Sequence, residues 1–460
     1  MMRIWWLSLT LTIFLVGCQT TNPIHEPTEV ATIQEPEVTC QDVAQNWGQN
    51  WPLVITSLEA LQIRGVSCGA EPLPSKLYAA HFSYGVQLEQ AGDVAGSITQ
   101  FQAAFALDPQ RAEALNTLAR LDALPEPTPA ACPTNTPPAS DPAQNVPPPT
   151  DLVTAEGQQL IWRNDPFLVR GVNYYPRYAP WHRFLTDADV AEMAAELDLI
   201  TAAGFNTIRI FLWYEPLFLC EPERAIPNEE TFGRLDALFA LAAERDLKLI
   251  VTLNDLPDLL FRPLYTDWER YDAQTTYIVR RYRHEPHILA WDLRNEGDLD
   301  HGARGDEAMF NQEEVLNWLG HISQLVREHD PHHLLTAGWW GNPQITVPHV
   351  DVLSFHHWYD VETLQMNLAE FQTSKPLLMQ EFGYHSWADA PQDVRDEETQ
   401  AVLLKQMITT AEKQGIAGWL VWTAFDFVPE AGQPAVYEHH FGLWRTDLSP
   451  KPALTAVRSE

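Results

Sequence analysis

The chain has 460 residues, and 45% of them are hydrophobic, which is ordinary for globular protein and leaves room for two domains and a linker. Its 62 acidic residues outnumber the 29 basic ones, so the formal net charge is -33. A field of this sign repels nucleic acid and strongly anionic polysaccharides, and a neutral polymer is the easier partner. The simpler explanation of the acidity is that it only keeps the protein soluble.

The first residues have the pattern of a targeting segment. Arg3 precedes an apolar run over residues 4–16 that is too short to span a bilayer comfortably. Its end, Leu15-Val16-Gly17-Cys18, resembles the bacterial lipoprotein signal, which implies cleavage before Cys18 and acylation of that cysteine. Residues 1–18 are then a signal peptide, residues 19–37 a flexible tether, and the protein is lipid-anchored to a bacterial cell membrane or outer membrane, outside the cytoplasm. An ordinary secretory peptide or membrane anchor is the alternative.

Residues 38–123 are expected to form a small all-α domain. Apolar residues recur at the helical period between Lys76 and Leu121, with a turn at Gly92-Asp93. The segment resembles a tetratricopeptide unit, whose small and aromatic positions are matched by Gly85, Ser97, Phe101, Ala104 and Pro109. Such repeats need about three units to bury a continuous face, so helices between residues 43 and 63 would complete the stack. This predicts a docking surface for a protein partner, and a helical spacer without a ligand is the alternative.

The cysteines beyond Cys18 lie in a compartment that permits disulfides. They are Cys40, Cys68, Cys132 and Cys220. Cys40 and Cys68 flank a helical stretch, so a bridge between them is a reasonable expectation, and a buried thiol is one interpretation of Cys220. The stretch over residues 65–69 matches the nucleophile elbow of serine hydrolases, but that pattern requires a preceding strand, which the sequence does not predict there.

Residues 124–150 are dominated by proline, threonine, alanine and serine, a composition typical of an extended linker. Beyond it, in residues 151–460, apolar runs alternate with amphipathic segments. Strands are predicted over residues 168–174, 207–212, 248–253, 288–293, 334–337, 352–355, 377–380 and 418–422. Helices are predicted over residues 187–203, 230–245, 266–283, 312–329 and 397–414. This is the scale of a (β/α)₈ TIM barrel of about 250 residues. An open doubly wound sheet is the runner-up, although no glycine-rich phosphate loop follows the first strand.

Two glutamates each end an apolar run that has the pattern of a buried parallel strand. Glu296 closes the stretch Trp291-Asp292-Leu293-Arg294-Asn295-Glu296-Gly297, and Glu381 closes Pro376-Leu377-Leu378-Met379-Gln380-Glu381-Phe382-Gly383. Each carboxylate would therefore stand at the carboxyl end of a strand, which is where barrel enzymes keep their catalytic residues.

A set of motifs follows successive predicted strands between residues 167 and 457: Gly171-Val172-Asn173-Tyr174-Tyr175-Pro176, Arg209, Asn295-Glu296, His356-His357-Trp358, Glu381 and Trp422. With these motifs the region resembles a clan A glycoside hydrolase, closest to the family 5 cellulases and mannanases. The resemblance implies degradation of a β-linked neutral polysaccharide or oligosaccharide of mannan or glucan type. It assigns Glu296 as acid/base and Glu381 as nucleophile, with retention of configuration and without a metal or cofactor.

Supporting roles follow from the same chemistry. Arg209 is expected to keep Glu381 ionised and to lower its pKa, while the pKa of the acid is raised. Asn295 would donate to the sugar 2-hydroxyl, His356 would line the pocket beside Glu296, and Trp422 would stack on the sugar ring. Further substrate-binding or supporting residues are predicted at Asn173, Tyr174, Trp213 and Trp358. Trp358 stands where the family commonly has a tyrosine, and its indole cannot replace a phenol beside the nucleophile, which leaves Tyr359 as a substitute to consider.

Several alternatives stay open from the sequence. The carboxylates could form structural ion pairs with Arg209 or Arg294. The histidine pairs 332–333, 356–357 and 439–440 lack the helical spacing of metal ligands. Sugar platforms are candidates at Trp213, Trp339, Trp340, Trp387 and Trp444. A transglycosylase on the same scaffold and a non-catalytic sugar-binding lipoprotein are the other functional hypotheses.

Overall fold

The computed structural model describes residues 38–68, 72–108, 112–121, 123, 149–220, 224–255, 264–265, 268–302, 310–388, 395–430 and 435–458. The signal peptide with Cys18, the tether, Cys132 and most of the proline-rich linker lie outside these residues, so what the sequence predicts for them stays a prediction. Within the described residues, no helix has both the length and the apolar character that a membrane crossing requires.

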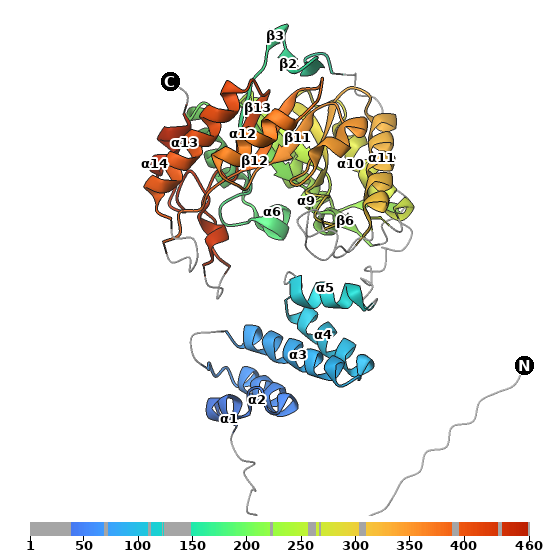
Figure 1. Cartoon of the computed structure of the whole chain (residues 1–460), viewed down its shortest axis with the longest axis vertical. Helices are drawn as coiled ribbons and strands as arrows, with labels where there is room; N and C mark the ends of the chain where they lie inside the picture. The colour runs from blue at the N-terminus through green and yellow to red at the C-terminus, as the bar shows by residue number, and fades with distance from the viewer. Residues whose placement is uncertain are drawn as a thin grey trace, which may run out of the picture.

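The described N-terminal residues are helical (Figure 1). The helices are α1 (Cys40–Asn46), α2 (Trp51–Ile63), α3 (Leu73–Gln90), α4 (Val94–Leu107) and α5 (Ala112–Arg120). A disulfide joins Cys40 to Cys68, which confirms the expected bridge. Helices α3 and α4 pack closely because Gly85 faces Phe101, and a Cβ at Gly85 would lie 2.6 Å from that ring. Asp93 begins α4 by accepting a hydrogen bond from the amide of Gly96 at 3.0 Å, as helix N-caps do.

Eight parallel strands form the sheet of the C-terminal domain, in the order β10-β9-β8-β5-β4-β13-β12-β11. They are β4 (Val169–Asn173), β5 (Thr207–Phe211), β8 (Lys248–Thr252), β9 (Ile288–Asn295), β10 (Leu334–Gly338), β11 (Leu353–His356), β12 (Leu377–Phe382) and β13 (Gly418–Val421). Strand β4 pairs with β13, and a parallel bridge between Trp339 and Phe355 joins the remaining two edges. The sheet is therefore a closed TIM barrel, and the open-sheet alternative is wrong.

Helices surround the barrel (Figure 1). The longer ones are α7 (Val190–Ala202), α9 (Glu229–Glu244), α10 (Glu269–Tyr282), α11 (Gln312–His329), α12 (Val361–Glu370) and α13 (Glu397–Lys413), followed by the shorter α14 (Pro452–Val457). A side chain with an oxygen acceptor, such as Asp189 before α7 or Asp396 before α13, caps many of them. The strands are almost entirely buried, so their near-continuous apolar runs are the pattern that the sequence predicted.

Two small β elements were not predicted, and neither were the helices α12 and α14. A three-stranded antiparallel sheet, β1 (Thr154–Glu156), β2 (Gln159–Trp162) and β3 (Asp165–Pro166), precedes the barrel. Its Leu160 packs in one cluster with Val169 and Ile250, and Lys248 at the start of β8 lies over the ring of Trp162. This sheet therefore covers the amino end of the barrel, opposite the strand ends that hold the glutamates. The hairpin of β6 (Phe218–Leu219) and β7 (Ile226–Pro227) is the second element.

Cys220, which follows β6, is disulfide-bonded. The interpretation of Cys220 as a buried thiol is therefore wrong.

Candidate active site

The two predicted carboxylates meet at the carboxyl end of the barrel. Glu296 directly follows β9 with a φ of 48°, an uncommon conformation for a non-glycine residue, and its amide donates to the Gly338 carbonyl at 2.7 Å. Glu381 lies in β12, and each of the two residues has 6% of its surface exposed. Oxygen atoms of Glu296 and Glu381 and a ring nitrogen of His356 all lie within 4.8 Å of one another.

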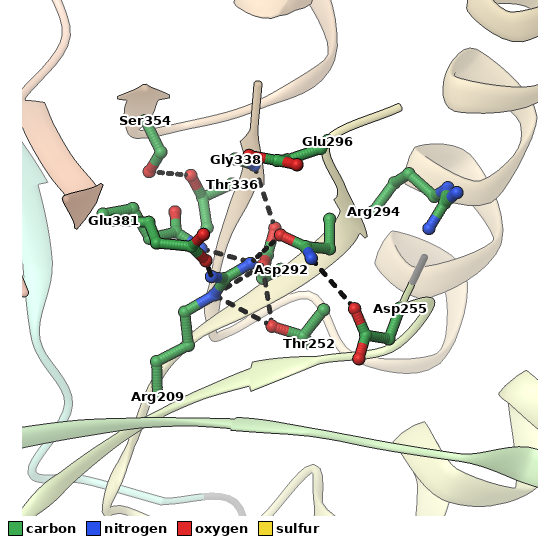
Figure 2. A network of polar contacts seen from close by, with 12 residues as sticks. Arg209, Thr252, Asp255, Asp292, Arg294, Glu296, Thr336, Gly338, Ser354 and Glu381 are labelled. Carbon is green, nitrogen blue, oxygen red and sulfur yellow. Dashed lines mark hydrogen bonds and ion pairs between the residues drawn. The ribbon is translucent and has the colours of Figure 1, made fainter. Parts of the chain in front are cut away.

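Arg209 is the centre of the polar network beneath these carboxylates (Figure 2). Its guanidinium is fully buried and donates to Glu381 Oε2 at 2.7 Å, to Asp292 Oδ2 at 2.7 Å and to Asn295 Oδ1 at 2.8 Å. It also donates to Asn173 Oδ1 at 3.1 Å and to Thr252 Oγ1 at 3.0 Å. The Nη1, Nη2 and Nε donors thus fix Glu381 and Asn295 relative to each other.

Asp292 and Gln380 belong to this network, and the sequence did not single them out as site residues. Asp292 Oδ2 accepts from Gln380 Nε2 at 2.8 Å as well as from Arg209, and its Oδ1 accepts from the Gly338 amide at 3.1 Å. Both residues are fully buried on inward positions of β9 and β12. Arg294, the next candidate partner for the glutamates, pairs with Asp300 at 3.1 Å instead.

A second chain of hydrogen bonds orients Asn295 from the side. Its Nδ2 donates to Asp255 Oδ1 at 2.9 Å, Asp255 Oδ2 accepts from the Tyr175 hydroxyl at 2.9 Å, and that hydroxyl accepts from Trp213 Nε1 at 3.0 Å. Trp213 has 2% of its surface exposed, so it supports this chain and is no sugar platform.

Tyr174 does not lie at the site. Its hydroxyl donates to Glu196 of α7 at 2.8 Å, in the layer between the sheet and the helices. Successive side chains on a strand point to opposite faces, and Asn173 points inward to Arg209. The prediction that Tyr174 is a site residue is therefore wrong, and Tyr175 takes that place.

His356 and Trp358 both contact Glu296. His356 Nδ1 lies 2.8 Å from Glu296 Oε1, and Trp358 Nε1 donates to the same oxygen at 3.3 Å. Trp358 is thus a partner of Glu296 and not of Glu381. Tyr359 is half-exposed and packs on Trp340, and the described contacts give it no bond to Glu381.

Trp422 follows β13, and its amide donates to the carbonyl of Phe382, the residue after Glu381, at 2.7 Å. Its ring has 8% of its surface exposed and lies among Tyr175, Phe211 and Phe427. Its Nε1 donates to Glu438 Oε1 at 3.0 Å. Glu438 is a third carboxyl at the site, on the short helix η5 (Tyr437–His440), and no strand or helix pattern in the sequence pointed to it.

The family model of the cellulases, glycosyl hydrolase family 5, matches residues 164–426. The chain belongs to this family. It is therefore a glycosidase, and the predicted fold and enzyme class are confirmed.

Similar proteins agree with this assignment at low identity. The chain is 24% identical, over 303 residues, to the probable mannan endo-1,4-beta-mannosidase C of Aspergillus terreus, which covers 51% of this chain and 74% of that protein. It is 26% identical, over 226 residues, to the putative mannan endo-1,4-beta-mannosidase 4 of Arabidopsis thaliana, which covers 41% of this chain and 52% of that protein. Among solved structures, the GH5_18 protein of Streptomyces cattleya in complex with Manb1-4GlcNAc is similar in fold, with 22% identity and a TM-score of 0.53 over 63% of this chain and 78% of that one.

The pKa values of the two glutamates in this family 5 site are shifted in the opposite directions from those expected. Burial raises the pKa of Glu381 to about 7, and the charge of Glu296 adds to the rise, although His356 and Arg209 oppose it. Burial alone would raise the pKa of Glu296. The hydrogen bond and charge of His356, together with the hydrogen bond from Trp358, outweigh burial, so the pKa of Glu296 is lowered. Arg209 lowers the pKa of Glu381, as predicted, but burial outweighs it. The prediction that the acid Glu296 has the raised pKa and the nucleophile Glu381 the lowered one is therefore wrong for the free site. The reason is that burial dominates at Glu381, whereas Glu296 receives hydrogen bonds from His356 and Trp358 that offset its own burial.

The donor atoms of Glu296, His356 and Glu381 also have the types that bind a divalent transition metal. They belong to the two candidate catalytic carboxyl groups and to the histidine beside Glu296. The prediction that no metal takes part stays a prediction.

The remaining candidate platforms divide between core and rim. Trp339 and Trp444 are buried core residues. Trp340 packs against Trp358 at the carboxyl end of the barrel, and Trp387 packs against His440.

Proposed function

We propose that the enzyme is a retaining glycosidase of a β-linked neutral glycan, with Glu381 as nucleophile and Glu296 as acid/base. The observation that carries this proposal is that carboxyl oxygens of the two residues lie within 4.8 Å. Retaining glycosidases hold their carboxyl groups roughly 5 to 5.5 Å apart, whereas inverting enzymes need roughly 6.5 to 9.5 Å to seat a water.

In the first step, Glu381 attacks the anomeric carbon. Arg209 holds Oε2 of Glu381, which leaves Oε1 to face the sugar. Glu296 gives its proton to the glycosidic oxygen, the bond from that oxygen to the anomeric carbon breaks, and a glycosyl ester of Glu381 forms. In the second step, Glu296 takes a proton from water, the water oxygen attacks the anomeric carbon, and Glu381 leaves with its electron pair. Asn295, fixed by Arg209 and Asp255, is placed to donate to the 2-hydroxyl of the sugar.

His356 supplies the proton that Glu296 needs. Burial lowers the pKa of His356, but the charges of Glu381 and Glu296 raise it by more, so its pKa lies above the ordinary value. Nδ1 and Glu296 Oε1 are 2.8 Å apart, so a proton passes between them without movement of either side chain. The active form holds one proton on the His356–Glu296 pair and none on Glu381.

The substrate class we propose is β-mannan, with β-glucan second. The relatives named above are described as mannan endo-1,4-beta-mannosidases, the indole of Trp422 suits an apolar sugar face, and the net charge of -33 favours a neutral glycan.

We also propose that Cys18 anchors the enzyme to a bacterial membrane by lipid, and that the helical region docks a protein partner. Their support is the sequence pattern around Cys18 and the helix pairs of residues 40–120.

The test is release of reducing sugar from β-mannans, β-glucans and xylan by the parent, Glu381→Ala and the matched surface variant Glu398→Ala. We expect Glu381→Ala to lose about a thousandfold or more in rate, because the nucleophile supplies several kcal/mol of the acceleration. Glu398→Ala should match the parent because Glu398 is exposed on α13. Equal residual activity in the parent and Glu381→Ala would overturn the role of Glu381.

Product analysis by NMR tests the stereochemistry, because a retaining enzyme releases the β-anomer first. Products longer than the substrate would indicate that the enzyme is a transglycosylase. Saturable binding without new reducing ends would instead support the non-catalytic hypothesis, against which stands the complete set of Glu296, Glu381, Arg209 and Asn295.

A further inference from the structure

Glu438 is a carboxyl at the site that the double displacement does not use. It stands on η5, in the segment that follows the last barrel strand. The backbone around it is fixed, because the His439 amide donates to the Val436 carbonyl at 3.0 Å and the Ser386 amide donates to the His440 carbonyl at 3.0 Å. Lys451, which is buried, donates to the same His440 carbonyl at 3.3 Å. Glu438 is therefore held in place by its own segment, before any ligand arrives.

The carboxyl of Glu438 has hydrogen-bonding capacity that its surroundings leave unused. Its Oε1 accepts from Trp422 Nε1 at 3.0 Å, and among the described residues no other donor and no cation reaches the group. Glu438 is only partly buried. Burial, together with the charges of Glu381 and Glu296, raises the pKa of Glu438 to about 7. Keeping the Glu438 carboxylate ionised near Glu381 and Glu296, with no cation beside it, costs free energy. A hydrogen bond donated by a bound hydroxyl group would offset part of that cost.

We propose that Glu438 is a specificity-determining residue that accepts a hydrogen bond from a hydroxyl group of the sugar that stacks on Trp422. This inference rests on the proposed function, because it names the sugar that the same site accepts. The sugar must be neutral at that position, since a uronic acid would bring a fourth carboxyl next to Glu438, Glu381 and Glu296. Arg209 cannot compensate, because its donors already serve Glu381, Asp292 and Asn295.

The competing explanation is that Glu438 only holds the indole of Trp422. Both roles weaken catalysis when Glu438 is removed, so activity alone does not separate them. They differ in their dependence on the substrate: a contact to one hydroxyl matters only when that hydroxyl is present, whereas a misplaced indole affects every sugar.

The experiment measures kcat/KM of the full-length parent, Glu438→Ala and Glu438→Gln on an aryl β-mannoside, an aryl β-glucoside and monodeoxy analogues that each lack one hydroxyl. The matched control is Glu430→Ala, at a half-exposed glutamate of the same segment that faces His182. We expect Glu438→Ala to lose about 10- to 150-fold on the intact sugar, which is what a hydrogen bond to a charged group contributes. On the one analogue that lacks the contacted hydroxyl, parent and Glu438→Ala should be equal.

Glu438→Gln keeps an acceptor for Trp422 and removes the negative charge. The ratio of kcat/KM on the neutral aryl glycoside to kcat/KM on the matching aryl β-glucuronide should therefore be smaller in this variant than in the parent. Two outcomes would overturn the inference and leave the glycosidase assignment standing. In one, Glu438→Ala loses the same factor in kcat/KM on every analogue; in the other, it loses nothing while the parent is fully active. A parent that cleaves none of the aryl glycosides and none of the β-mannans or β-glucans would overturn both. Thermal unfolding of each variant shows whether a loss reflects misfolding.

Discussion

Arg209 shows how one side chain sets the geometry of the site. Its donors reach residues from β4, β8, β9 and β12, so it joins strands that lie on different sides of the barrel. The sequence identified Arg209 and Glu381 as partners because their motifs occur in a fixed order. It could not identify Asp292 as the second acceptor, because that contact depends on which side chains point inward at the same height of neighbouring strands.

Activity should depend on pH with an acid limb set by Glu381. As the proposed nucleophile, Glu381 attacks only when ionised. Its pKa is about 7, so kcat/KM should fall tenfold per pH unit as the pH drops well below that value. The charge of His356 lowers the pKa of Glu381, so His356→Asn should raise that pKa and move the acid limb to higher pH, by about one unit. The measurement is the pH profile of kcat/KM.

The control is His357→Asn, because His357 Nε2 bonds the Asp360 carbonyl and not the carboxylates. This variant should leave the position of the limb unchanged. A limb that stays in place or moves to lower pH in His356→Asn would contradict the assigned coupling between His356 and Glu381.

At the scale of elements, the barrel strands were predictable and the smaller elements were not. Parallel strands covered on both faces are continuous apolar runs, so all eight strands were predicted. The sheet of β1 to β3 is short and half-exposed, with no apolar periodicity to mark it. Tyr174 and Tyr175 illustrate the limit at the site: a motif places both at a strand end, but only the register decides which one points inward.

The close packing of α3 on α4 requires a glycine at position 85, because the Phe101 ring occupies the space that a side chain would need. Gly85→Ala would place a Cβ 2.6 Å from the Phe101 ring, so we expect a loss of about 1 to 3 kcal/mol from overpacking, more than the roughly 1 kcal/mol that alanine gains in helix propensity. Gly233→Ala in α9, where a Cβ meets nothing within 4 Å, should be neutral or stabilising. Urea unfolding followed by circular dichroism measures both.

Phe101→Leu in the Gly85→Ala background should restore part of the lost stability, because it frees space at the contact. If Gly85→Ala is as stable as Gly233→Ala, the close packing of α3 on α4 does not control the stability of the helical region.

At the scale of the whole molecule, the proposed lipid anchor at Cys18 determines whether the protein is found with the membrane. Cys18→Ala removes the thiol that would carry the acyl chains, so the variant should leave the membrane fraction and appear in the soluble fraction with its glycosidase activity intact. Cell fractionation with an activity assay on each fraction measures this. A variant that stays with the membrane, or a parent that is soluble, would contradict the anchor.

The pairing of β4 with β13 has a consequence for synthesis of the chain. The first strand of the barrel finds its second neighbour only when the last strand has been made, at residues 418–421. The proposed machinery follows the same order, since Arg209 is made early, Glu381 late and Trp422 after the final strand. A growing or truncated chain therefore has no closed ring and no complete set of catalytic groups, so the capacity to cut glycans arises only in the finished protein.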